Sequence, residues 1–183
     1  MPQLVSFLKH QVPRDIAAQI RSGIRMVWPQ LNPGHNKIWT PPAGVPLDRM
    51  TFVLMEDELL VSHAEVSFRT LDHAGQRWEV GGLSAVFTYP AHRGSGAGEQ
   101  VVGAATDYLR KSKADFALLF CGERVKSLYL RQGWEQTPGL KVIYGPDNQT
   151  YADGYCLSLV VSDRARAQRF DPNQPLHVGK NTW

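Results

Sequence analysis

The stretch from residue 83 to residue 102 constrains the fold more than any other part of the chain. An apolar run rich in strand-forming residues ends at Tyr89-Pro90, a glycine-dense turn follows, and a helix pattern then begins. The first N–H groups of a helix have no partner within the helix and lie at the positive end of its dipole, so such a turn is typical of a phosphate site. Glycines at 94, 96 and 98 let the backbone approach a ligand with no Cβ in the way. We therefore expect a strand–turn–helix unit that binds phosphate.

Two nucleotide-binding loops fit this stretch less well. A P-loop needs lysine and then serine or threonine after its last glycine, where this chain has Glu99. A dinucleotide loop needs a third glycine, and that position holds Glu99 when counted from Gly94 or Val101 when counted from Gly96. Asp115 does lie at about the right distance for a ribose-binding acid, but it precedes the next apolar run instead of ending it. A dinucleotide-binding protein therefore stays as the weaker rival.

Length and composition favour one ordinary globular domain covering residues 1–183, with 43% hydrophobic residues. The net charge is only +3 and no Lys/Arg run exceeds two residues, which argues against a nucleic-acid partner. No apolar run approaches a membrane span, and no secretory signal is visible. Cys121 and Cys156 lie in apolar runs, and the histidines are widely spaced, so we expect buried thiols and no metal. These features predict a cytoplasmic protein without a membrane partner.

The hydrophobic periodicity predicts an α/β (α+β) order with one parallel crossover near the middle. We expect strands at 4–9, 51–55, 59–68, 77–88, 116–121, 140–144 and 155–161, and helices starting at Pro13, at 95–112 and after Gly122. The last two strands are expected to be joined by a turn at 145–148. Residues 29–49 are rich in proline and predict a long irregular loop of the kind that often shapes a binding pocket.

Two motifs together resemble a known family. Arg93-Gly94-Ser95-Gly96-Ala97-Gly98 matches the Arg-x-x-Gly-x-Gly coenzyme A loop of the GNAT superfamily of N-acetyltransferases. Leu128-Tyr129, three further residues and Gly133-Trp134 resemble the second GNAT signature, in the order and at the separation that the family shows. The resemblance covers residues 82–134. It implies the GNAT fold, a mixed, mostly antiparallel central sheet flanked by helices, with the coenzyme A loop between a central strand and the next helix.

Within the superfamily, the chain looks most like the aminoglycoside 2'-N-acetyltransferases. The stretch from Ser62 to Gly94 has their spacing without a gap, and the C-terminal Trp183 is also characteristic of that group. Two departures concern the substrate. The acidic residue that this group has on the strand before the loop is replaced here by Ser84, and the chain is mildly basic where the group's pockets for polycations are acidic.

The resemblance implies transfer of an acetyl group from acetyl-coenzyme A to the amine of a small molecule in one direct step. Residues expected to hold the cosubstrate are Arg93, Gly94, Ser95, Gly96, Ala97 and Gly98 at the diphosphate, and Val86, Phe87 and Thr88 as a strand edge for the pantetheine amides. A backbone N–H in the same edge could hold the thioester oxygen as negative charge develops. Members of the family are often dimers, which makes a homodimer the other partner to consider.

The catalytic assignments follow from the resemblance and leave alternatives open. Tyr129 occupies the family's general-acid position, the alternative being a core tyrosine with a hydrogen-bonded hydroxyl. The general base has several candidates, namely Ser84 acting through a water, Glu79, Glu65, His63 and the Trp183 carboxylate. Three of these residues, Ser84, Glu65 and Trp183, are also expected to contact the acceptor. Loss of the acid at Ser84 favours a rival reading, a GNAT-fold module that binds acyl-coenzyme A without catalysis.

Overall fold

The structure, a computed structural model, describes residues 1–29, 49–144, 147–150 and 155–179. Trp183 and all but the two end residues of the predicted 29–49 loop lie outside this part of the chain. Its helices are α1 (Arg14–Val27), α2 (Ala97–Arg110), α3 (Glu123–Leu130) and α4 (Asp163–Ala167), with short 3₁₀ turns η1 (Lys9–Gln11) and η3 (Pro90–His92). Its strands are β1 (Gln3–Leu8), β2 (Met50–Glu56), β3 (Leu59–His73), β4 (Gln76–Thr88), β5 (Phe116–Phe120), β6 (Glu135–Gln136), β7 (Val142–Tyr144), β8 (Gln149–Thr150), β9 (Cys156–Val160) and β10 (Leu176–His177).

The strands confirm the expected α+β fold. In the described residues the main sheet has the order β1-β2-β3-β4-β5-β9-β6, and a small second sheet has the order β10-β7-β8. β1 pairs antiparallel with β2, and β9 pairs antiparallel with both β5 and β6. β4 and β5 are parallel, with Val80–Gly82 facing Phe116–Leu118. The sheet is therefore mixed and mostly antiparallel, as the GNAT resemblance implied, and the parallel pair is the predicted crossover.

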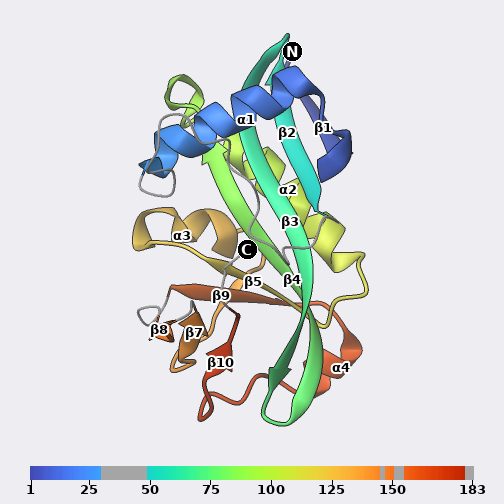
Figure 1. Cartoon of the computed structure of the whole chain (residues 1–183), viewed down its shortest axis with the longest axis vertical. Coiled ribbons are helices and arrows are strands. Elements are labelled where there is room, and N and C mark those ends of the chain that lie inside the picture. The colour runs from blue at the N-terminus through green and yellow to red at the C-terminus, as the bar shows by residue number, and fades with distance from the viewer. Residues whose placement is uncertain (30–48, 145–146, 151–154, 180–183) are drawn as a thin grey trace. The chain divides into compact units, whose positions relative to one another are not determined.

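The chain forms two compact units, and each is built from two separate stretches. The first unit contains Met1–Glu65 and Ala85–Ala105, and the second contains Val66–Ser84 and Thr106–Trp183. The chain therefore passes from one unit to the other inside β3, inside β4 and inside α2, all labelled in Figure 1.

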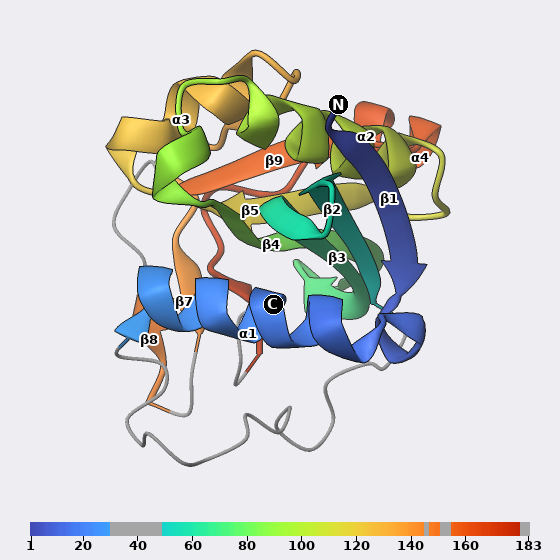
Figure 2. The same cartoon turned by 90° about the horizontal axis from the view of Figure 1, so that it is seen from above.

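In the first unit, α1 lies against strands β1 and β2 and the start of β3 (Figure 2). Its inner face contributes Ile16, Ile20 and Ile24, at the helical spacing that the sequence shows. Gly23 faces the Phe87 ring of β4 so closely that a Cβ built on it would lie 2.3 Å from that ring. The glycine therefore lets α1 approach the strand that leads into the glycine turn.

In the second unit, three aromatic rings form the centre of the core. Phe116 and Phe170 stack at 4.2 Å, and the edge of Trp78 lies 5.1 Å from the Phe116 ring. Trp78 and Phe116 are almost completely buried, as are the flanking apolar residues of β5 and β9. This core supports the parallel β4–β5 pair from one side.

Three expectations need correction in detail. The helix predicted at 95–112 begins at Ala97, because Gly96 has the left-handed φ of +81° and cannot start a right-handed helix. β3 runs past Phe68 to His73, since the turn is confined to Ala74 and Gly75, both with positive φ. The strands expected at 140–144 and 155–161 are not joined by a single turn, because β8 lies between them and pairs antiparallel with β7, while β9 joins the main sheet beside β5.

Candidate active site

The glycine turn is built by a 3₁₀ turn and two left-handed glycines. Pro90 opens η3, and the N–H of Arg93 donates to its carbonyl at 3.2 Å. Gly94 and Gly96 both have φ of +81°, a conformation that glycine adopts without a steric penalty. Between them, the Ser95 hydroxyl donates to the His92 carbonyl at 2.7 Å, which ties the tip of the turn to its start.

The turn leaves a group of backbone donors free at the start of α2. The N–H groups of Gly94, Gly96, Ala97 and Gly98 donate to no acceptor within the described residues. A Cβ built on Gly94 or Gly96 would have no atom within 4 Å, so the surface above the turn is open. Clustered N–H groups at a helix N-terminus form an anion site. These residues therefore fit a diphosphate such as that of coenzyme A.

Arg93 adds a positive charge to this cluster. Its side chain is exposed, and its Nε donates to the Thr88 carbonyl at 3.3 Å. Within the described residues the two terminal nitrogens of the guanidinium make no further contact. The Nε bond anchors the side chain at the end of β4 and leaves the charged end available to a phosphate.

The last four residues of β4 depart from regular strand geometry. Ala85 has a φ of +50°, a left-handed conformation that costs a non-glycine residue about 1 kcal/mol. Phe87 is buried against α1, whereas Val86 and Thr88 are half-buried. The side chain of Phe87 thus belongs to the core, and only its backbone remains for the pantetheine edge expected at 86–88.

Residues 61–63 of β3 hold this segment of β4. The Ser62 hydroxyl lies 2.9 Å from the Phe87 carbonyl and 2.8 Å from the Thr88 hydroxyl. The His63 Nδ1 lies 2.7 Å from the Ala85 carbonyl, and its ring stacks on Phe87 at 5.1 Å. The first unit therefore brings His63, Ala85, Phe87 and Thr88 together.

Burial determines the charge of His63. The ring is completely buried, and this lowers its pKa to about 4 although the nearby Glu65 and the bond to the Ala85 carbonyl raise it. The ring is therefore neutral near pH 7. Its Nε2 is buried and makes no hydrogen bond within the described residues.

Glu65, predicted as a base or acceptor contact, is held in an ion-pair cluster. Its two carboxylate oxygens each lie 2.5 Å from a cation, Lys9 Nζ and Arg49 Nη1. Burial raises the pKa of this carboxyl, but the charges and hydrogen bonds of Lys9 and Arg49 outweigh it and hold the pKa below its usual value. Glu65 is a stable anion whose charge is already neutralised, so it is poorly suited to take a proton.

Tyr129 lies on α3 in the second unit, with a side chain that is almost completely buried. Burial, with a smaller contribution from Cys121, raises the pKa of its hydroxyl well above the usual value. Tyr129 is therefore protonated at neutral pH, as an unperturbed tyrosine would be, and burial makes its hydroxyl a weaker acid.

The end of α3 explains the rest of the second motif. Gly133 has a φ of +83°, and its N–H and that of Trp134 donate to the carbonyls of Leu130 and Tyr129. This is a Schellman cap, which requires glycine at the left-handed position. The indole N–H of Trp134 then donates to the Thr106 hydroxyl of α2 at 3.0 Å. The Gly-Trp pair thus stops the helix that carries Tyr129 and fixes it to α2.

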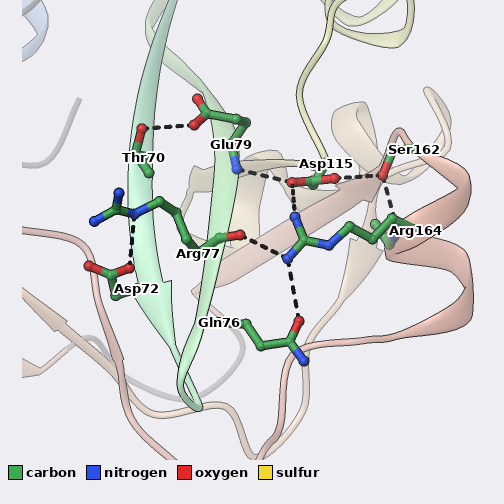
Figure 3. Close-up of polar contacts among 9 residues, drawn as sticks. Thr70, Asp72, Gln76, Arg77, Glu79, Asp115, Ser162 and Arg164 are labelled. Atoms are coloured by element: carbon green, nitrogen blue, oxygen red, sulfur yellow. Dashed lines mark hydrogen bonds and ion pairs between the residues drawn. The ribbon is translucent and has the colours of Figure 1, made fainter.

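Ser84 and Glu79, both on β4, belong to the second unit. Ser84 is half-buried and directly precedes the left-handed Ala85. Glu79 is exposed, and its carboxylate accepts a hydrogen bond from Thr70 at 2.9 Å (Figure 3). Glu79 also lines an open pocket of about 420 Å³ with Phe68, Tyr108 and Lys111–Ala114, all residues of the second unit.

Asp115, considered above as a ribose-binding acid, is fully engaged in a structural cluster (Figure 3). Its carboxylate accepts from the Glu79 N–H, from the Ser162 hydroxyl and from Arg164 Nη1. Arg164 also donates to the Arg77 carbonyl and lies 4.1 Å above the Trp78 ring. Both carboxylate oxygens of the buried Asp115 are thus held by protein donors, which weakens the main support for a dinucleotide site.

The described ranges contain both cysteines and five of the six histidines. Cys121 and Cys156 are free and buried, and burial raises their pKa values to about 11 and about 12. No group of His, Cys, Asp or Glu side chains there has the arrangement of a metal site. None of the helices in those ranges is long and apolar enough to cross a membrane.

Sequence reasoning missed the left-handed Ala85 and the contacts that hold it. Alanine carries no local signal for positive φ, and a histidine on a sheet face is as often a packed side chain as a functional one. The alternation His63, Glu65, Ser67 did place His63 on the correct face of β3. Its partner on β4 required the structure.

The mixed sheet with its parallel β4–β5 pair and the glycine turn before α2 are features expected of acyl-coenzyme A-dependent transferases. A family model described as an acetyltransferase (GNAT) domain matches residues 31–137, more than half of the chain. The chain therefore belongs to the GNAT family, for which acyl-coenzyme A binding is typical. No curated protein matches the chain.

Solved structures share the fold at low sequence identity. A GNAT family N-acetyltransferase, YhbS from Escherichia coli, in complex with CoA, gives a TM-score of 0.62 at 15% identity over 96% of this chain and 88% of its own. An acyl-CoA N-acyltransferase from Pseudomonas aeruginosa gives 0.57 at 14% over 86% of this chain and 99% of its own. A GCN5-related N-acetyltransferase from Anabaena variabilis gives 0.58 at 17% over 74% of this chain, which spans only 33% of that protein.

Proposed function

We propose that this protein transfers the acetyl group of acetyl-coenzyme A to a primary amine of a small molecule. The observation that carries the proposal is the cluster of four backbone N–H groups at Gly94, Gly96, Ala97 and Gly98 that have no acceptor among the described residues, with the Arg93 guanidinium beside it. This donor set suits the coenzyme A diphosphate. When bound, acetyl-coenzyme A supplies the thioester whose carbonyl carbon the amine attacks.

In the proposed reaction, one C–N bond forms and the thioester C–S bond breaks. Tyr129, which is protonated at neutral pH, is the proposed donor of the proton that the leaving thiolate takes up. The amine loses its proton to water or to a base. Glu65 is disfavoured as that base by its two cations, and Ser84 can only orient a water. The Val86–Thr88 backbone is the proposed edge for the pantetheine amides.

The acceptor class has one specific starting point. The spacing from Ser62 to Gly94 resembles that of the aminoglycoside 2'-N-acetyltransferases, so an aminoglycoside with a 2'-amino group is the first acceptor to test. The neutralised Glu65 and the serine at position 84 offer little free negative charge to a polycation. Acceptors with fewer positive charges therefore belong in the same panel.

The test is acetyl-coenzyme A-dependent thiol release across a panel of amines that includes aminoglycosides with a 2'-amino and with a 2'-hydroxyl group. Release with an amine, reduced at least tenfold in kcat by Tyr129→Phe, supports the enzyme and the general acid. Silence across the panel together with tight coenzyme A binding would instead favour the non-catalytic binding module. Release that ignores the 2' substituent would reject the subfamily acceptor and leave the reaction intact.

A further inference from the structure

The left-handed residue in β4 is the starting point. Among the described non-glycine residues with positive φ, Asp57, Ala74 and Asn148 lie in turns, and only Ala85 lies inside a strand. An alanine holds this conformation within a strand only where its surroundings impose it. The contacts of Ala85 must therefore include one that fixes its backbone.

That contact comes from His63 on β3. The Nδ1 of His63 lies 2.7 Å from the Ala85 carbonyl oxygen, and a carbonyl can only accept a hydrogen bond. Nδ1 therefore carries the proton, and in the neutral ring Nε2 does not. The ring cannot turn away easily, because it is completely buried and stacked on Phe87 with an angle of 26° between the ring planes.

The bond sets the orientation of the peptide between Ala85 and Val86. In a trans peptide, the C=O and the N–H point to opposite sides. Described residues contain no cis peptide bond, so the Val86 N–H points away from the side on which His63 holds the Ala85 carbonyl. Because the peptide is planar, any rotation that turned the Ala85 carbonyl would turn the Val86 N–H by the same angle.

We propose that His63 is a positioning residue for acetyl transfer, whose hydrogen bond to the Ala85 carbonyl aims the Val86 N–H at the thioester oxygen of bound acetyl-coenzyme A. The inference rests on the proposed function and assigns a single backbone donor to it. As the amine attacks, negative charge develops on that oxygen, and a fixed N–H stabilises the charge without reorganisation. The unprotonated Nε2 takes no part in the step.

Three substitutions at position 63 separate this role from others. His63→Asn places an amide nitrogen close to the position of Nδ1 and keeps a donor for Ala85. His63→Gln places its amide near the position of Nε2, and His63→Leu has no donor. We expect kcat to fall about ten- to hundredfold in the leucine and glutamine variants, as when an oxyanion donor is lost, and to stay within about threefold of wild type in the asparagine variant.

A matched control comes from the second buried histidine. His73 is 4% exposed and lies in the second unit, where its Nε2 accepts a hydrogen bond from the Asp171 N–H at 3.0 Å. His73→Leu should lower the unfolding temperature about as much as His63→Leu while leaving kcat unchanged. An equal fall of kcat in both leucine variants would overturn the inference, because destabilisation alone would explain it. So would an asparagine variant as slow as the leucine variant.

A binding readout keeps the inference separate from the proposed function. Failure of the wild-type protein to release thiol with any amine would reject the function alone. The Val86 amide resonance can still be followed by NMR during titration with acetyl-coenzyme A. We expect acetyl-coenzyme A to shift it more than desulfo-coenzyme A does in wild type and in His63→Asn, and this difference to vanish in His63→Leu. The same difference in all three proteins would overturn the inference.

Discussion

The glycine turn and the Asp115 cluster use polar groups in opposite ways. In the turn, four backbone N–H groups and the end of the Arg93 side chain have no acceptor within the described residues. Around Asp115, the carboxylate accepts from three donors, and Arg164 continues the network to the Arg77 carbonyl. Unused donors at a helix start are available to a ligand, whereas a saturated cluster holds strands and helices together. The contrast separates residues that should affect binding from residues that should affect stability.

Removing Asp115 should have the largest effect. Asp115→Ala leaves the Glu79 N–H, the Ser162 hydroxyl and Arg164 without their acceptor, at about 1 kcal/mol or more for each lost bond. We expect the free energy of unfolding in urea to fall by about 3 to 4 kcal/mol, with no change in the Kd for acetyl-coenzyme A. Asp72→Ala, which breaks an exposed pair with Arg77, is the control and should cost less than about 0.5 kcal/mol. Weakened coenzyme binding in the folded Asp115 variant would break the comparison.

His63 lies between these two cases, because Nδ1 is hydrogen-bonded and Nε2 has no partner within the described residues. Its titration makes the stability of the protein depend on pH. Its pKa is about 4 in the folded protein and about 6.5 in the unfolded chain, so below pH 6.5 the unfolded state binds more protons. Stability is therefore lost as pH falls from 6.5 towards 4, by about 3 kcal/mol in total. Urea unfolding at several pH values should show this slope in wild type and a smaller one in His63→Asn. Equal slopes would mean that His63 does not titrate as its burial implies.

Glu65 should act in a lower pH range. The pKa of Glu65 in the folded protein is held below the usual value of 4.5. Its contribution to the free energy of unfolding is therefore fully present above pH 4.5 and is lost as the pH falls through the folded-state pKa. His63 and Glu65 therefore affect stability in different pH ranges. The loss of stability between pH 6.5 and pH 4.5 reports protonation of His63 and not of Glu65. Lys9→Met, which removes one of the two cations, should shift the Glu65 loss to higher pH and leave the upper range unchanged.

Removing the Arg93 charge should affect binding alone. Arg93→Ala should weaken the Kd for acetyl-coenzyme A about tenfold, or about 1.4 kcal/mol, because one charge-assisted contact with a phosphate is lost. The unfolding temperature should not change, since the guanidinium is exposed. Calorimetry with Arg77→Ala, which removes an exposed arginine outside the turn, gives the control. Unchanged affinity in the Arg93 variant would exclude it from the site.

Two glycines with the same geometry give the smallest and most closely matched test. Gly96 and Gly139 have φ of +81° and +78°, and a Cβ on either would meet nothing within 4 Å. Gly96→Ala and Gly139→Ala should each cost about 1 kcal/mol of stability through left-handed strain. Only Gly96→Ala should also weaken coenzyme A binding, by about three- to tenfold, because its Cβ and any shift of φ disturb the donor cluster. Equal coenzyme affinity in both variants would remove the turn from the binding site.

The sequence correctly predicted the features that depend on residues close together in the chain. Apolar periodicity located α1, α2 and the strands, and the left-handed glycines at 94, 96 and 133 occupy turns where glycine was expected. The position of β9 beside β5 could not be predicted, because the pairing joins segments that are about 40 residues apart and carries no register signal. The same holds for Asp115: spacing suggested a ligand-binding acid, while its true partners, Ser162 and Arg164, lie far along the chain. Long-range contacts decide which polar residues are already satisfied.

The passage of the chain between its two units inside β3, β4 and α2 has a consequence for recombination. Neither unit is encoded by one contiguous piece of the gene. Residues 66–84 of the second unit separate the two stretches of the first, and residues 85–105 of the first unit separate the two stretches of the second. A single crossover between distant homologues within residues 66–105 would give both units segments from both parents, whereas one before residue 66 divides only the first unit and one after residue 105 divides only the second. We therefore expect functional chimaeras to tolerate exchange of whole loops more readily than exchange at residues 65, 84 or 105, where the junction would fall within a strand or helix. Libraries of variants are better built by substitution than by shuffling.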